Sequence, residues 1–180
     1  MNLRYLMHRY GYIADSDEKQ EEKEPEYKKG EFGNIYTQFN GDIEGAVEFL
    51  KKVKNGECVN VLHRLDIGFV SLIWGEKGYG KRFEGGYGLN HILAKHEEEL
   101  KQLGLSVEDV ISYVFENGEL DLKELDKYGK ILIKKDKFLL VIKVDWNKDE
   151  LDNPFILTIY DLRSVKEKEK IKNELKKREV

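Results

Sequence analysis

Apolar residues recur at helical spacing in three stretches of the chain. The first covers residues 42–54 and is followed by Asn55 and Gly56, which are typical of a helix C-terminus. The second covers about residues 89–103. The third begins with a capping box at residues 106–109, in the order Ser-Val-Glu-Asp, and continues to about Glu116. The pattern therefore predicts three amphipathic helices.

Between and after these helices the spacing changes to that of strands, with β-branched and aromatic residues in short runs. A tight polar turn and a longer loop at 147–154 separate the last three runs, which is the arrangement of an antiparallel meander. Helices followed by antiparallel strands predict an α+β fold, with the helices packed on one side of an antiparallel sheet. The predicted strands are 58–62, 68–74, 130–134, 138–146 and 155–162.

The two ends of the chain are strongly charged. Residues 15–29 contain almost no apolar side chain, and we interpret them as a linker after a short amphiphilic arm at 4–14. A second capping box at Ser164 opens a helix rich in Lys and Glu. We therefore expect an arm and linker at 1–29, a main domain at 30–164 and a charged helix at 165–180.

Composition favours a soluble domain. Of the 180 residues, 37% are charged, and neither a bilayer-spanning apolar stretch nor a signal peptide is present, so we expect no membrane association and a location in the cytoplasm of a target cell or on a phage. The net charge of −4 confines any RNA contact to a local patch. The single cysteine, Cys58, is expected to be a small buried residue. No metal or cofactor is expected.

A glycine-rich loop at 75–88 follows the second strand. Its first part almost matches the phosphate-binding P-loop, but Arg82 stands where that loop needs Ser or Thr for magnesium. Two interpretations stay open: a mobile loop whose Lys77, Lys81 and Arg82 bind phosphodiester oxygens, or an ordinary exposed loop.

The second helix carries two histidines. His91 and His96 are five residues apart, so in an α-helix they point about 140° away from each other, which prevents shared metal binding. His96 falls on the apolar stripe and is expected to be a hydrogen-bonded, partly buried histidine. His91 is expected beside Lys95 on the polar side, where it could titrate near neutral pH.

Two further groups of residues could carry chemistry. His63, Arg64 and Asp66 put an imidazole, a guanidinium and a carboxylate into one turn-like segment, which could supply an acid, a phosphate clamp and an orienting group. On the last strand, alternation places Thr158 and Tyr160 on one face, as surface residues.

Three blocks together resemble one family. They are Ile-Tyr-Thr-Gln-Phe at 35–39 with the helix at 46–56, His-Arg-Leu-Asp-Ile-Gly at 63–68 leading to Leu-Ile-Trp-Gly at 72–75, and Gly-Leu-Asn-His-Ile-Leu-Ala-Lys-His at 88–96. In order and content they resemble the phage-associated domain that is fused to Mu-type head morphogenesis proteins and classed as a barnase-EndoU-colicin-RelE-like (BECR) nuclease. The likeness covers about residues 30–163. Arg64, where lysine is expected in relatives, and an insertion at 79–86 depart from it.

The resemblance implies a BECR-like α+β fold and metal-independent cleavage of RNA, in which the 2′-hydroxyl attacks the adjacent phosphate. Such a reaction needs a base, an acid and cations around the phosphorane. His91 is the implied acid or base and His63 or His96 its partner; Arg64, Lys95 and Arg163 are the implied phosphate clamps, and Thr158 or Tyr160 the hydrogen-bond donors.

The expected partner is RNA, in particular tRNA, and an immunity protein is a further candidate; relatives of this kind are often part of a larger phage or toxin polypeptide. Two other functions stay open. One is a toxin that transfers ADP-ribose from NAD, which the lack of a recognisable Ser-Thr-Ser strand disfavours. The other is a non-enzymatic module whose acidic surface binds a basic protein.

Overall fold

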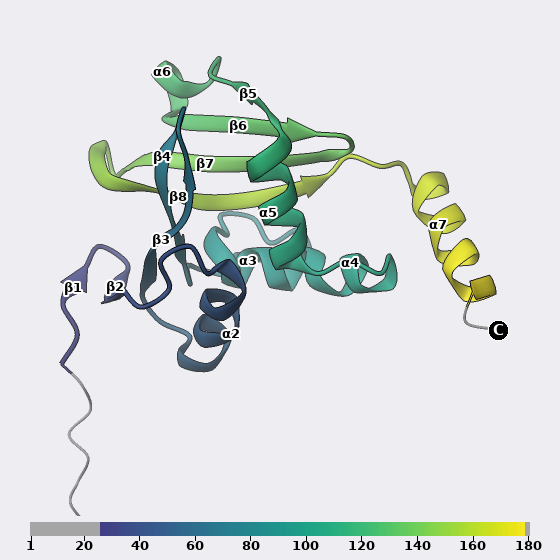
Figure 1. Ribbon diagram of the computed structural model, residues 1–180, viewed down its shortest axis with the longest axis horizontal. Coiled ribbons are helices and arrows are strands. Elements are labelled where there is room, and N and C mark those ends of the chain that lie inside the picture. The colour runs from purple at the N-terminus through teal and green to yellow at the C-terminus, as the bar shows by residue number, and fades with distance from the viewer. Residues whose placement is uncertain (1–25, 179–180) are drawn as a thin grey trace, which may run out of the picture.

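The computed structural model describes residues 26–178, so the predicted arm and most of the predicted linker lie outside the described residues. Eight strands form one sheet in the order β1-β2-β3-β4-β8-β7-β6-β5 (Figure 1). Five of the seven strand pairings are antiparallel, and β2–β3 and β4–β8 are parallel. The α+β class is therefore confirmed. The strands are β1 (Lys29–Gly30), β2 (Gly33–Tyr36), β3 (Glu57–Arg64), β4 (Gly68–Ile73), β5 (Glu119–Asp121), β6 (Lys130–Lys135), β7 (Phe138–Trp146) and β8 (Asp149–Asp161).

The sheet consists of two parts that meet at a single bridge. Ser71 of β4 pairs with Phe155 of β8, and the two strands then diverge. In Figure 1, β3 and β4 run across the direction of β6, β7 and β8. The divergence leaves room for a helix beside β8.

Helices α2 (Ile43–Val53) and α5 (Val107–Asn117) cover one face of the sheet. Both begin where the sequence predicts: the Asp42 carboxylate accepts a hydrogen bond from the Gly45 amide, and Ser106 Oγ accepts one from the Asp109 amide. Their apolar sides join the sheet in one hydrophobic core. That core includes Ala46, Leu50, Leu72, Ile111, Phe115, Leu140, Ile156 and Ile159.

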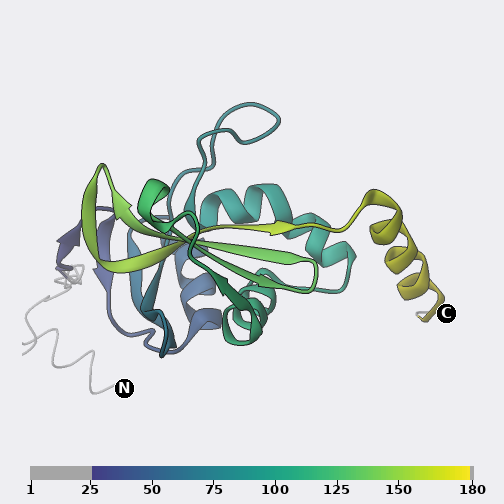
Figure 2. The same ribbon diagram turned by 90° about the horizontal axis from the view of Figure 1, so that it is seen from above.

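The helix predicted at 89–103 is present, but it is not a regular α-helix. It consists of α3 (Gly88–Ile92), a π turn η1 (Leu93–Glu97) and α4 (Glu98–Gln102). It packs against β8 and β4, and Figure 2 shows it on the side of β8 that faces away from α5. The π turn changes which residues share a face, as described below.

Strand β8 starts earlier than predicted and carries a bulge. Residues 147–154 are not a loop, because a two-residue turn at Asn147 and Lys148, with φ of 52° and 73°, leads directly into β8. Val141 pairs with Thr158 but Ile142 pairs with Ile156, so one extra residue lies between them. As a result Ile156 and Ile159 both join the core, while Phe155, Thr158 and Tyr160 face the opposite side.

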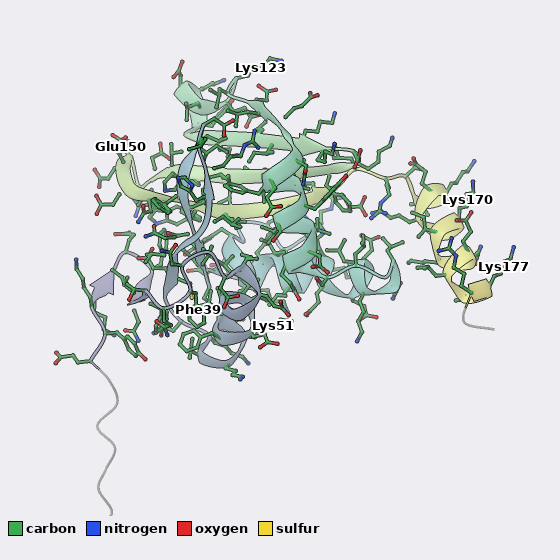
Figure 3. All side chains as sticks on the ribbon, in the orientation of Figure 1. Phe39, Lys51, Lys123, Glu150, Lys170 and Lys177 are labelled. Atoms are coloured by element: carbon green, nitrogen blue, oxygen red, sulfur yellow. The ribbon has the colours of Figure 1, made fainter. Side chains whose placement is uncertain are left out.

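The charged helix α7 (Val165–Arg178) follows β8 and is anchored to α4. The predicted capping box is confirmed, since the Ser164 amide donates to the Glu167 carboxylate at 2.8 Å and the Glu167 amide donates to Ser164 Oγ at 3.3 Å. Lys168 pairs with Glu99 of α4 at 3.1 Å. The rest of α7 projects away from the sheet, with Lys170 and Lys177 at its surface (Figure 3). Within residues 26–178, no helix is long and apolar enough to cross a membrane.

Candidate functional site

The polar side chains that are buried in the described residues lie on a few adjoining elements. There are four of them: Ser71 of β4, His91 of α3, His96 of η1 and Thr158 of β8. Helix α3 contacts both β4 and β8, so these elements adjoin one another. Three buried side-chain atoms of the described residues have no hydrogen-bond partner: Ser71 Oγ and His96 Nε2 in this region, and Asn60 Oδ1 on β3. Buried polar atoms without partners are costly for folding and are found at functional sites, which makes this region the candidate site.

The π turn corrects the prediction that His91 and His96 point apart. In an α-helix they would be about 140° apart, but a π turn bonds residue i to residue i+5 and aligns residues five apart on one face. Both imidazoles are buried: His91 is 5% exposed and His96 is 8% exposed. The two rings are close enough that the charge of His91 lowers the pKa of His96. The predicted position of His91 on the polar side of the helix is therefore wrong. π turns inserted into α-helices are frequent at functional sites.

His91 is held by the hairpin formed by residues 75–87. Its Nδ1 lies 3.2 Å from the carbonyl oxygen of Lys77, and because a carbonyl can only accept, Nδ1 carries the proton and Nε2 is left with a free lone pair. Burial lowers the pKa of His91, the hydrogen bond to Lys77 opposes this shift, and the charge of Lys95 adds to it. His91 is therefore a neutral imidazole at neutral pH, with Nε2 able to accept a proton.

The hairpin fits closely over this ring because residue 86 is glycine. A Cβ at Gly86 would overlap His91 Nδ1 and the carbonyl oxygen of Lys77. The close approach of backbone to a functional side chain is a common reason for glycine.

His96 is the more strongly perturbed histidine. Burial lowers its pKa to about 4, the charges of Lys95, His91 and Lys168 act in the same direction, and Glu99 opposes them. His96 is buried as predicted, but its Nε2 lacks the hydrogen bond that the prediction gave it. The free protein thus holds two neutral imidazoles on one helix face.

Strand β8 contributes two hydroxyl groups opposite the helix. Tyr160 is 38% exposed; the His96 ring centroid lies 6.5 Å from its ring and Lys95 Nζ lies 5.3 Å from its centroid. Thr158 shares this face but is buried, so its prediction as a surface residue is wrong. Thr158 is buried because α3 packs against β8. The alternation of residues along a strand shows which side chains share a face, but not whether a helix covers that face.

The glycine-rich segment forms a hydrogen-bonded hairpin. Backbone hydrogen bonds join Glu76 to Tyr87 and Tyr79 to Glu84 in both directions at 2.9–3.0 Å. Lys77 Nζ lies 5.5 Å from the Phe83 ring, which in turn lies 6.5 Å from the His91 ring. Lys81 and Arg82 are exposed at the tip, which projects from the body of the molecule (Figure 2). The hairpin therefore places one cation near His91 and two farther out.

Two residues expected near His91 lie at the other end of β4. The end of β3 carries His63, which stacks on Phe69 with 4.4 Å between ring centroids, and Arg64, which pairs with Gly68 at the start of β4. Helix α3 instead begins beside Ile73, at the far end of β4. Arg64 donates to the carbonyl oxygen of Phe115 at 2.8 Å and pairs with Asp66 at 2.8 Å, contacts that fasten the turn to the end of α5.

Arg163 also has a structural partner. It forms a bidentate ion pair with Asp161, with Nη2 and Oδ2 2.7 Å apart, and its guanidinium lies 4.8 Å from the centre of the Phe138 ring. The Asp161 side chain is only 3% exposed, and Arg163 holds its pKa below the usual value against the effect of burial. Both interactions occupy the guanidinium that was expected to clamp phosphate.

Ser71 is the member of the site that sequence reasoning missed. A weak signal exists, because it is the one polar side chain within the apolar strand at 69–74. Cys58 is fully buried as predicted, and burial, followed by the charge of Glu57, raises the pKa of its thiol to about 12. Across residues 26–178, no group of three or more His, Cys, Asp or Glu side chains is arranged to hold a metal ion.

Comparison with known proteins identifies the family of the chain. No curated protein and no solved structure matches the chain. A family model matches residues 61–167, more than half of the chain, from the middle of β3 to the first turn of α7. The matched segment contains the whole candidate site: Ser71, the hairpin at 75–87, His91, Lys95, His96, Thr158 and Tyr160. The chain therefore belongs to the family described as phage-Barnase-EndoU-ColicinE5/D-RelE like nuclease1, PBECR1.

Proposed function

We propose that this chain is a metal-independent endoribonuclease that cleaves tRNA or other RNA and leaves a 2′,3′-cyclic phosphate. Membership of a nuclease-like family supports nuclease activity in general. The observation that carries the RNA mechanism is the buried pair of imidazoles on one helix face, with cations and hydroxyl groups around it. Imidazoles can move both protons that this reaction requires.

His91 is the proposed general base. Its Nε2 is unprotonated at neutral pH because Nδ1 donates to Lys77 and because burial lowers the pKa of the ring. In the proposed reaction Nε2 takes the proton from the 2′-hydroxyl as the 2′-oxygen forms its bond to phosphorus. The carbonyl of Lys77 fixes the tautomer and the orientation of the ring, the role that a second partner plays for most catalytic histidines.

His96 is the proposed general acid. In the free protein it is neutral, because burial and neighbouring cations lower its pKa. A bound phosphodiester adds a negative charge close to the ring and favours the imidazolium. The protonated ring then gives its proton to the 5′-oxygen as the phosphorus–oxygen bond to the leaving nucleotide breaks.

Positive charge around the phosphorane comes from Lys95, which lies over the Tyr160 ring, and from Lys77 on the hairpin. The Tyr160 hydroxyl is the proposed hydrogen-bond donor to a non-bridging oxygen. The Thr158 hydroxyl donates to the Ile159 carbonyl at 3.3 Å in the free protein and would have to turn away from it to act as a second donor. Lys81 and Arg82, at the exposed tip, would bind phosphates farther along the RNA strand. This local arrangement gives an acidic chain a surface for RNA.

The test is a cleavage assay with total tRNA in EDTA. We expect the wild-type protein to give discrete fragments ending in cyclic phosphate, and His91→Ala to lower the rate by about 100- to 10,000-fold. His63→Ala is the matched control: it removes an exposed imidazole at the other end of β4 and should leave the rate unchanged. Intact tRNA with the wild-type protein would contradict the proposal and favour ADP-ribose transfer or a binding module.

We further propose that this activity is toxic and that the chain acts as part of a phage or toxin polypeptide, with an immunity protein as a candidate partner. Expression inside bacteria should then slow growth, and His91→Ala should restore it. Equal growth with and without expression, at matched protein levels, would argue against a toxin.

A further inference from the structure

Four aromatic rings cluster at the foot of the hairpin, apart from the main hydrophobic core. Trp146 is at their centre, with ring centroids 4.6 Å from Tyr87, 5.4 Å from Phe32 and 5.6 Å from Phe155. Phe155 is fully buried, but Tyr87 and Trp146 are partly exposed. Phe32, Tyr87 and Trp146, together with Trp74, line a cavity of about 310 Å³. We refer to this cavity as the aromatic hollow.

The aromatic hollow lies on the same face of the sheet as the candidate site. Because of the bulge in β8, Phe155 faces the same side as Thr158 and Tyr160. Tyr87 is the residue immediately before α3, one helical turn ahead of His91. Thr158 is three residues beyond Phe155, so about 10 Å of strand separates them. The hollow is therefore within reach of a nucleotide next to the one held at His91.

The chemistry of the hollow suits a nucleobase. Partly exposed aromatic faces stack with bases. The charged side chains that line the hollow are Glu31, Glu76 and Lys54, so its lining carries a net negative charge and does not favour phosphate. Burial, then Glu76 and Glu31, raises the pKa of Tyr87, so its hydroxyl stays protonated and can donate a hydrogen bond. The volume is at the lower end of the range of about 300–1,000 Å³ that is usual for small-molecule pockets.

We propose that the aromatic hollow binds the base of the nucleotide that neighbours the scissile phosphate. The inference rests on the proposed function, because it takes RNA as the substrate of the adjoining site. It assigns Trp146 and Tyr87 to base stacking and thus to the positioning of the strand over His91.

Tryptophan fluorescence tests this directly, since Trp74 and Trp146 are the two tryptophans of the chain and both line the hollow. The probe is a single-stranded DNA oligonucleotide of mixed sequence, which cannot be cleaved because it lacks 2′-hydroxyls. An abasic oligonucleotide of equal length and charge is the control. We expect the probe to quench the fluorescence of the wild-type protein and of His91→Ala, and the abasic strand to leave it unchanged.

Trp146→Leu should weaken binding of the probe about 5- to 150-fold, measured by the fluorescence of the remaining tryptophan, Trp74. Tyr87→Leu is the second variant, for use if Trp146→Leu does not fold. Phe69→Leu is the matched control, an aromatic residue that is 44% exposed and lies at the start of β4, where it stacks on His63. Equal quenching by the abasic strand, or quenching by tetramethylammonium in place of the probe, would overturn the inference. Cleavage of tRNA without quenching would overturn this inference alone, whereas quenching without cleavage would overturn the proposed function and leave base binding in place.

Discussion

The His96 imidazole ties the stability of the fold to pH. Its pKa is about 4 in the folded chain and about 6.5 in the unfolded chain, so below pH 6.5 the unfolded chain binds the proton first. Stability is therefore fully present above pH 6.5 and is lost as the pH falls towards 4. From pH 7.5 to pH 5 this residue should lower the free energy of unfolding by about 2 kcal/mol. Urea unfolding at the two pH values measures the change.

Carboxylates also contribute to acid sensitivity, so the variant His96→Gln supplies the comparison. It removes the titrating ring but keeps a polar side chain of similar size, and it should lose less stability between the two pH values than the wild type by about the same 2 kcal/mol. An identical pH dependence of the two proteins would show that His96 is as solvated in the folded state as in the unfolded one.

Single residues show where sequence reasoning succeeds and where it stops. The block that contains His91, Lys95 and His96 identified the helix of the site, and Tyr160 lies beside it. The burial of His91 could not be predicted from the sequence, because a regular α-helix has 3.6 residues per turn whereas this helix contains a π turn. The side-chain chemistry of His63 and Arg64 predicts that they belong to the site, but they lie beside the start of β4 and α3 begins at its other end. Side-chain chemistry does not predict which end of a strand lies beside a helix.

The hairpin at 75–87 is the element whose conformation should matter most for activity. Gly86→Ala would place a methyl group against His91 Nδ1 and the Lys77 carbonyl, so the ring or the hairpin must move. A displacement of about 1 Å can cost about 100-fold in rate, and we expect a loss of this order with the fold retained. Cleavage kinetics together with circular dichroism measure the two effects.

Gly80→Ala is the control in the same hairpin. A Cβ at Gly80 meets no atom within 4 Å, and its φ of 62° adds only local strain. Its rate should stay within about three-fold of the wild type. Equal losses in both variants would mean that any change in the hairpin impairs the protein and that the contact with His91 is not special.

Elements with a strong local signal were predicted well. Capped amphipathic helices such as α2 and α5 and the apolar strands β4, β6 and β7 were found where expected. The very short strands β1 and β5 lack enough residues to show a period, and the polar start of β8 resembles a loop. The parallel pairing of β4 with β8 joins segments distant in the sequence, and periodicity carries no information about such pairings.

Positive side chains on the hairpin and on η1 should determine how strongly the proposed binding of RNA depends on salt. Lys77 and Lys95 belong to the candidate site, and Lys81 and Arg82 lie farther out at the tip of the hairpin. If all four contact phosphates, the logarithm of affinity should fall with the logarithm of salt with a slope of about −3. The double variant Lys81→Ala/Arg82→Ala should reduce this slope to about −1.4. KM for a single-stranded RNA between low and moderate salt measures it.

Lys123 is the control for this experiment, since Figure 3 places it beside β5 and the short helix α6 (Leu125–Tyr128), and its side chain is 88% exposed. Lys123→Glu changes the net charge by −2, as the double variant does, so it reports the effect of net charge without the effect of position. A slope that changes equally in all variants would mean that RNA binds diffusely rather than at the hairpin.

The single bridge between β4 and β8 has a consequence for the timing of translation. His91 and His96 leave the ribosome before β8, whose Thr158 and Tyr160 complete the site about 60 residues later. At about 5–20 residues per second, this interval is on the order of several seconds. For this interval a nascent chain carries both histidines without the Thr158 and Tyr160 hydroxyls, so under the proposed function it should not cleave the RNA of the cell that is making it until β8 has been added.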